Sequence, residues 1–203
     1  HVYPDSVHTE GITAITKEDV GYAGAWGGVI KLIGSVKMLE NGQVHIMVCP
    51  MLVQRGSQLA SVDDVFNGIM VRGDATGDVV FYGKGAGKLP TASAVVADVI
   101  DCVKHFKARK YLYWEDAKPG YVADFGAMET SAYVHAAAES GDKAFEAACA
   151  VFENPTRLLA KKPVKGEAGF TVSGLTEAAL EEKLRALEAR GVRVLNRIRI
   201  SDY

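Results

Sequence analysis

The sequence predicts an α/β protein in two parts, a mixed-sheet domain over residues 1–109 and a smaller α+β domain over residues 110–203. Strand-like runs alternate with helix-like patterns from Gly11 to about Lys107. A basic cluster at Lys104–Lys110 then leads into a Lys-Pro-Gly turn, which is typical of a boundary. The C-terminal residues combine an amphipathic helix with an alternating strand, which favours a separate α+β unit.

The first predicted elements are a short strand and a capped helix. The stretch "EGITAIT" at residues 10–16 has strand character. Thr16 is followed three residues later by Asp19, which is the spacing of a capping box. The helix is expected to end near Trp26, where the pair Gly27-Gly28 follows.

A β-hairpin is predicted over residues 29–54, "VIKLIGSVKMLENGQVHIMVCPMLVQ". Its two runs are rich in Val, Ile and Met, and Asn41-Gly42 supplies the positive φ of a tight turn. Pro50 has no N–H for the ladder and predicts an edge or a bulge within the second strand.

Residues 61–66 are predicted as a short helix capped by Ser61, and a second hairpin turns at residues 74–77. A glycine-rich loop then precedes a helix from about Thr91 to Phe106. Its apolar face comprises Ala94, Val95, Val99, Cys102, Val103 and Phe106.

The second part begins with a β-type run at Tyr111–Trp114. A strand at residues 131–140, a helix at 141–153 and a strand at 168–174 follow. The most strongly marked helix starts after Thr176 and stops at Gly191, and its buried stripe is Leu180, Leu184 and Leu187. The last strand, "VRVLNRIRI", carries Arg193, Arg197 and Arg199, which are interpreted as a solvated face in preference to an anion site.

Composition gives little support to several classes of function. A net charge of −2 gives little support to a nucleic-acid or membrane partner. The three cysteines form no CxxC pair, and Cys49 and Cys102 are expected to be buried thiols in a cytoplasmic protein. The five histidines lack metal-ligand spacing, so no metal site is predicted, and His45 and His135 are expected to be structural.

The stretch "FYGKGAGKLPT" places Gly83, Gly85 and Gly87 directly before a helix. Bare backbone at a helix start suits an anionic or flat ligand. The spacing is neither G-x-G-x-x-G nor a P-loop. From the residues alone, a ligand-contacting loop and a purely structural corner both stay open.

Three stretches taken together resemble one family. They are "EGITAITKEDVGYAGAWGGVIKLIG", "MLVQRGSQLASVDDVFNGIMVRGDATGDVVFYGKGAG" and "PTASAVVADV". Their order and content resemble homoserine dehydrogenase over about Glu10 to Lys104. The resemblance implies NAD- or NADP-dependent interconversion of homoserine and aspartate semialdehyde, on the route to threonine, methionine and isoleucine. It also implies a catalytic and dimerisation domain that forms a homodimer.

Carried over from the family, Gly85, Ala86, Gly87 and Thr91 are the expected cofactor contacts. The family's dinucleotide-binding domain and its D-x-x-G-x-D-x-x-x-K motif have no counterpart before Glu10. No catalytic residue is therefore predicted in this chain. We interpret the chain as a piece of a longer protein and expect it to be inactive alone.

The second part resembles the ACT regulatory module that ends many members of this family. "YLYWEDAKPGY" is similar to its first strand and D-x-P-G turn, with one residue inserted and without the expected helix after it. Asp116, Gly120 and Tyr121 are the corresponding effector-binding candidates. The alternative function is a non-catalytic unit for dimerisation and amino-acid sensing.

Overall fold

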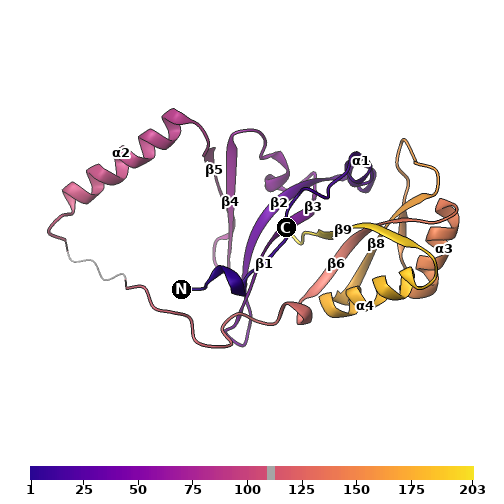
Figure 1. The fold of residues 1–203 in the computed structure, drawn as a ribbon. Coiled ribbons are helices and arrows are strands. Elements are labelled where there is room, and N and C mark those ends of the chain that lie inside the picture. The colour runs from indigo at the N-terminus through magenta and orange to yellow at the C-terminus, as the bar shows by residue number, and fades with distance from the viewer. Residues whose placement is uncertain (109–112) are drawn as a thin grey trace. The chain divides into compact units, whose positions relative to one another are not determined.

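The computed structural model describes residues 1–108 and 113–203 (Figure 1). These residues form two compact units, of which the first joins His1–Arg55 to Asp116–Tyr203 and the second is Gly56–Glu115. The predicted domains, residues 1–109 and 110–203, stay a prediction, because the boundaries of the two compact units lie at other residues.

The first unit is built on a seven-stranded sheet with the order β1-β3-β9-β6-β8-β7, in which β2 also pairs with β3. The strands are β1 (His8–Thr9), β2 (Gly28–Met38), β3 (Val44–Gln54), β6 (Glu129–Ala137), β7 (Thr156–Leu158), β8 (Glu167–Thr176) and β9 (Arg193–Ile200). Its helices are α1 (Lys17–Trp26), α3 (Gly141–Val151) and α4 (Glu177–Glu188), and its short 3-10 helices are Pro4–Ser6 and Phe125–Ala127.

The β2–β3 hairpin confirms the predicted one. The strands pair antiparallel from Gly28 opposite Gln54 to Met38 opposite Val44. Gly42 has φ +80°, as the turn requires. The predicted strand at residues 10–16 is wrong, because the short strand β1 precedes it and residues 12–14 form a turn.

Pro50 lies inside the sheet, so the prediction of an edge or bulge is wrong. The carbonyl of Val48 accepts from the amide of Glu10, and that of Leu52 accepts from Ser201. Backbone groups two residues apart point to the same edge of a strand. The backbone nitrogen of Pro50 therefore points into the gap between two partners of β3: β1, which pairs with residues 47–48 of β3, and β9, which pairs with residues 51–52. A missing N–H costs no hydrogen bond there.

Residues 129–200 form a β-α-β-β-α-β unit from β6, α3, β7, β8, α4 and β9. The strand order β9-β6-β8-β7 is that of a ferredoxin-like arrangement. The first strand is therefore Glu129–Ala137 and not the predicted run at Tyr111–Trp114. Tyr111 and Leu112 lie outside the described residues, while Tyr113 and Trp114 are not in a strand.

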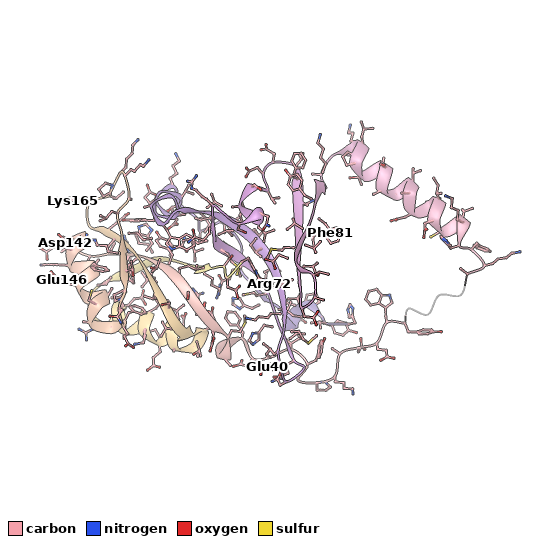
Figure 2. All side chains as sticks on the ribbon, turned by 180° about the vertical axis from the view of Figure 1, so that it is seen from behind. Glu40, Arg72, Phe81, Asp142, Glu146 and Lys165 are labelled. Carbon is pink, nitrogen blue, oxygen red and sulfur yellow. The ribbon has the colours of Figure 1, made fainter. Side chains whose placement is uncertain are left out.

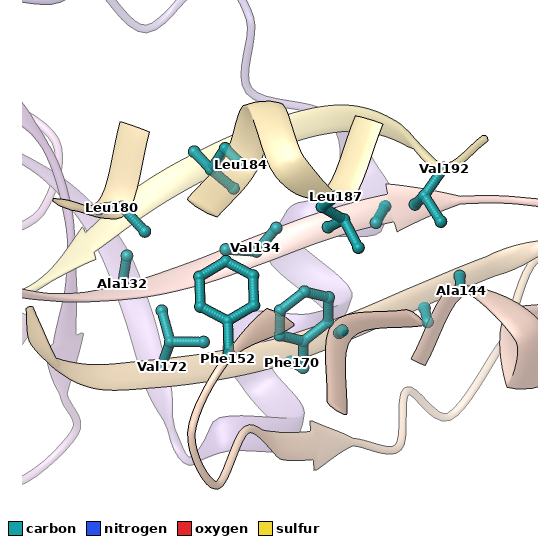
Figure 3. Packing of buried hydrophobic residues seen from close by; sticks show 13 residues of the cluster. Ala132, Val134, Ala144, Phe152, Phe170, Val172, Leu180, Leu184, Leu187 and Val192 are labelled. Atoms are coloured by element: carbon teal, nitrogen blue, oxygen red, sulfur yellow. The ribbon is translucent and has the colours of Figure 1, made fainter. Parts of the chain in front are cut away.

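Strand β6 is buried on both faces because the sheet has helices on both sides. Ala132, Val134 and Ala136 face α3 and α4, where they join the larger core (Figure 3). Tyr133 packs on the other face with residues of α1. The larger core comprises Ala132, Val134, Ala136, Ala144, Ala148, Phe152, Ala168, Phe170, Val172, Leu180, Leu184, Leu187 and Val192.

The capping predictions for both strongly marked helices are confirmed. At α1, the hydroxyl of Thr16 accepts from the amide of Asp19, and the Asp19 carboxylate accepts from the amide of Thr16. At α4, Thr176 accepts from the amide of Ala179, and the predicted leucine stripe is buried.

The second unit contains β4 (Phe66–Gly73), β5 (Gly77–Lys84) and α2 (Lys88–Lys104). The hairpin confirms the predicted turn, and Arg72 pairs with Asp78 across it; Figure 2 labels Arg72 and Phe81 on these strands. The predicted helix at residues 61–66 is wrong, because Ser57 instead caps a 3-10 helix at Gln58–Ser61.

Helix α2 confirms the predicted helix, although it begins earlier than Thr91. None of its described residues is buried. Cys102 is therefore exposed, contrary to the prediction, whereas Cys49 is buried as expected. No helix within the described ranges is long and apolar enough to span a bilayer.

Candidate functional site

The glycine loop connects β5 to α2, and part of its geometry serves as a structural corner. The amides of Gly85 and Ala86 both donate to the carbonyl of Val65, at 3.1 and 3.4 Å. A Cβ on Gly85 would lie 1.6 Å from Nδ2 of Asn67. A larger residue at position 85 would therefore have to displace the side-chain amide of Asn67.

Gly87 is the N-cap of α2 and has φ +115°, a backbone conformation that disfavours other residues. It has no side chain to cap the helix. Its carbonyl accepts from the amide and the hydroxyl of Thr91, at 3.2 and 2.9 Å. The predicted cofactor contacts, Gly85, Ala86, Gly87 and Thr91, thus lie together in the loop before α2 and the first turn of that helix.

The start of α2 presents few free donors. A helix leaves its first four amides, counted from the N-cap, without intrahelical partners, but Pro90 has no N–H. The amides of Gly87, Lys88 and Leu89 remain, while the amide of Thr91 makes the first intrahelical bond, to the carbonyl of Gly87. Because the loop residues are exposed, these three amides and the main chain of Ala86 are the groups that fit a cofactor edge.

The predicted effector residues lie on the turn that returns the chain to β3. The carboxylate of Asp116 accepts from the hydroxyl of Tyr3 at 2.9 Å. Gly120 has φ +77°, and its carbonyl accepts from Nε2 of Gln43 at 2.7 Å. The carbonyl of Tyr121 accepts from the amide of Val44. No α-helix directly follows this turn, because residues 121–123 pair with the start of β3.

A cavity of about 430 Å³ lies beside this turn. Gly120 and Tyr121 line it, whereas Asp116 does not. Aromatic rings surround it, and the rings of His8 and Phe125 stack with their centroids 3.5 Å apart. The structure therefore separates the three effector candidates, two on the cavity wall and one bonded to Tyr3.

Sequence reasoning missed a buried carboxylate on α1. Asp19 is fully buried and accepts hydrogen bonds from Thr16, Tyr133, His135 and Asn196. Burial alone would raise the pKa of Asp19, but the bonds from His135, Thr16 and Asn196 outweigh it and hold that pKa well below its usual value. The capping box signalled only the bond to Thr16.

His135 lies between two carboxylates. Its Nδ1 is 2.9 Å from Asp19 and its Nε2 is 3.0 Å from Glu167. Both ring nitrogens can donate only in the imidazolium form. Burial alone would lower the pKa of His135, but the hydrogen bonds to Asp19 and Glu167 raise it. This is a structural imidazole, as predicted.

A second ionic cluster corrects the prediction for β9. Arg199 is 2% exposed and donates to both oxygens of Glu177, at 2.6 and 2.9 Å, and to Glu10 at 2.8 Å. Arg197 donates to the same two carboxylates, at 3.2 and 3.0 Å. The solvated face is wrong for Arg199, because α4 and the segment at Glu10 cover that end of the strand. Arg193 is exposed as predicted.

Glu10 titrates far from its usual range. Burial raises its pKa, but hydrogen bonds from Arg199 and His8 and the nearby charge of Arg197 lower it to about 2. Among the described residues, no buried side-chain nitrogen or oxygen lacks a hydrogen-bond partner. The two ionic clusters therefore link α1, α4 and the strands of the first unit through satisfied hydrogen bonds.

Metal ligation has no support within the described ranges, where no group of three or more His, Cys, Asp or Glu side chains is arranged to hold an ion. Of the residues predicted to contact a ligand, those of the glycine loop are exposed, and Gly120 and Tyr121 line a cavity.

Comparison with known proteins identifies related sequences. Residues 1–100 match the family profile described as homoserine dehydrogenase. A homoserine dehydrogenase from Pseudomonas aeruginosa is 45% identical over 100 residues, which cover 49% of this chain and 23% of that protein. One from Mycobacterium bovis is 32% identical over 209 residues, which cover 92% of this chain and 46% of that protein.

Solved structures extend the similarity to the second half of the chain. A homoserine dehydrogenase from Thiobacillus denitrificans superposes with a TM-score of 0.75 at 29% identity, covering 98% of this chain and 48% of that one. A structure of the enzyme from S. aureus gives a TM-score of 0.71 at 28% identity and covers all of this chain and 49% of that one. The chain therefore spans about half the length of these proteins.

Proposed function

Because residues 1–100 belong to the homoserine dehydrogenase family, we propose that the chain is part of an NAD(P)-dependent oxidoreductase that interconverts L-homoserine and L-aspartate 4-semialdehyde. The observation that carries this proposal is the continuity of the match, which runs through the β2–β3 hairpin and the glycine loop into α2. The pathway would be the biosynthesis of threonine, methionine and isoleucine, in the cytoplasm.

In this proposal the glycine loop contacts the nicotinamide end of NAD or NADP. The bound cofactor supplies or accepts the hydride. The chain contributes exposed main chain at Gly85, Ala86 and Gly87 and the free amides at the start of α2, while Thr91 fixes the carbonyl of Gly87. These groups would orient the cofactor and would not transfer a proton.

The proton-transfer lysine and the main cofactor cradle are outside these residues. The 203 residues contain neither a G-x-G-x-x-G fingerprint nor the family's D-x-x-G-x-D-x-x-x-K motif. We therefore expect the chain alone to show no turnover of aspartate semialdehyde. Measurable oxidation of NADPH with this substrate by the chain alone would refute that expectation.

The proposed homodimer is supported by the outer strand of the sheet. Leu32, Val36 and Met38 alternate along β2 on one face and are 53%, 71% and 65% exposed. Apolar side chains that share a face of a strand favour a covered surface. Sedimentation of the chain tests this, and a monomer at every concentration examined would contradict it.

The alternative function, a non-catalytic unit for dimerisation and amino-acid sensing, is favoured by the ferredoxin-like arrangement of β6 to β9 and by the cavity beside Gly120 and Tyr121. Calorimetry with threonine tests it. Heat of binding for threonine without any binding of NADPH would favour sensing, and flat heats at millimolar threonine would exclude this effector.

The cofactor contact can be tested at single glycines. We expect NADPH at millimolar concentration to shift the amide resonances of residues 85–89, and Gly87→Ala to weaken this response because alanine is strained at φ +115°. Gly83→Ala is the matched control, since a Cβ at residue 83 meets nothing within 4 Å. Equal responses in both variants would mean that the loop is only a corner.

A further inference from the structure

A second cavity, of about 520 Å³, lies between α1 and the connection from β7 to β8. The α1 side of the cavity, here called its floor, comprises the small residues Gly21, Gly24 and Ala25 together with Tyr22. The exposed side chains of Val20 and Val164 also line it. The volume is within the range of small-molecule sites, roughly 300 to 1,000 Å³.

The rim of this cavity is basic. Lys17 from α1, Arg55 from the end of β3, and Lys161 and Lys162 from the connecting loop line it, against one acidic residue, Glu18. None of these four cations makes an ion pair with any residue that the structure describes.

This excess is local, because the whole chain carries a net charge of −2. Elsewhere in the first unit, buried basic side chains are matched by carboxylates, as Arg199 is by Glu177. Unmatched positive charge around a concave surface concentrates anions there.

The guanidinium of Arg55 leans over the floor of the cavity. A Cβ on Gly24 would lie 4.0 Å from its Nη2. A planar guanidinium presents paired donors to a carboxylate or a phosphate. Lys161 and Lys162 line the same cavity from the β7–β8 connection, so an anion bound by them and by Arg55 would contact residues on both sides of the cavity.

We propose that this cavity binds a small organic anion, with an apolar or aromatic body on the glycine floor and a phosphate or carboxylate between Arg55 and the lysines. The site lies away from the glycine loop in sequence and does not rest on the proposed function. Because α1 belongs to the family-matched segment and the lysines belong to the ferredoxin-like unit, an occupant would tie these two pieces together.

Phenyl phosphate is a suitable probe, and inorganic phosphate and benzyl alcohol carry its charge and its apolar body separately. Amide resonances of the full 203-residue chain are followed during titration. We expect phenyl phosphate to shift the amides of Gly21, Gly24, Lys161 and Lys162 in a saturable way that weakens with added salt. We expect weaker binding of inorganic phosphate and none of benzyl alcohol.

The double variant Lys161→Ala/Lys162→Ala should weaken phenyl phosphate binding about two- to thirtyfold, as the loss of two exposed ion pairs predicts. Lys165→Ala is the matched control, because Lys165 lies on the same loop (Figure 2) but does not line the cavity. Gly21→Leu should fill the floor and abolish binding without lowering the thermal midpoint, because a Cβ there meets nothing within 4 Å and leucine favours a helix.

Three outcomes would overturn the proposal. The first is the absence of saturable shifts at these amides with phenyl phosphate. The second is equal weakening by Lys165→Ala and by the double lysine variant, which would indicate attraction to the loop in general. The third is equal affinity for inorganic phosphate and phenyl phosphate, which would remove the role of the apolar floor.

Discussion

Replacing Arg199 with methionine removes the central charge of the ionic cluster at β9. Arg199 is 2% exposed and donates to Glu177 at 2.6 and 2.9 Å and to Glu10 at 2.8 Å. After the substitution Glu177, which is 3% exposed, keeps only the bond from Arg197 at 3.2 Å. A buried carboxylate would then be left with about a third of its donors.

Removing one partner of a buried ion pair costs about 3–5 kcal/mol. With a urea slope of about 2 kcal/mol/M, the unfolding midpoint should fall by about 2 M. The exposed residue Arg193, on the same strand, is the control, and Arg193→Ala should change the free energy of unfolding by less than about 0.5 kcal/mol.

Urea unfolding followed by circular dichroism measures both variants. A second change, Glu177→Gln in the Arg199→Met background, should recover at least half of the loss, because it removes the stranded charge. The reasoning would be refuted if Arg199→Met cost less than about 1 kcal/mol, or if the double variant were less stable than the single one.

Two further predictions concern the α1 face of the sheet. The folded pKa of His135 is raised from 6.5, so the stabilisation that the imidazolium provides is complete below pH 6.5 and is lost as pH rises through the folded pKa. In urea titrations, the difference in stability between wild type and His135→Gln should therefore shrink once the pH exceeds the folded pKa. A difference that stays constant to pH 9 would contradict this. The folded pKa of Asp19 is lowered, so its contribution is present above its unfolded pKa and is lost only as pH falls through the folded value. Gly169→Ala should cost about 1–3 kcal/mol, because a Cβ there would lie 2.5 Å from the ring of Tyr22. Gly21→Ala, in open space on α1, should instead stabilise by up to about 1 kcal/mol, and the order of the two midpoints in thermal unfolding decides.

Elements with strong local signals were predicted well. The β2–β3 hairpin carries Asn41-Gly42 between β-branched runs, and α1 and α4 carry threonine caps at the expected places. Each of these signals depends only on residues a few positions apart, so it can be recognised from the local sequence alone. The predicted helix at residues 61–66 was wrong because local signals can also compete: Ser57, four residues before Ser61, is an equally good cap and is the one used.

Predictions that depended on distant partners failed. Arg199 alternates with apolar residues as a solvated residue would, but Glu10 lies 189 positions away along the chain and still pairs with it. The run at Tyr111–Trp114 was predicted as the first strand of the second part, but Tyr113 and Trp114 are not in a strand, and that position in the sheet belongs to Glu129–Ala137, between β8 and β9. The burial of Asp19 likewise depends on Tyr133 and Asn196, which no local pattern connects to it.

By itself, the sequence determined the family of residues 1–100, the hairpins and the caps, because motifs and turn chemistry act between neighbours along the chain. The tertiary structure alone decided which charges are buried and which strand opens the ferredoxin-like unit. It also placed the basic side chains of α1, β3 and the β7–β8 connection around one cavity. These outcomes depend on long-range pairing in the sheet, and the free energy of a buried charge depends on partners that only the folded chain brings within hydrogen-bond distance.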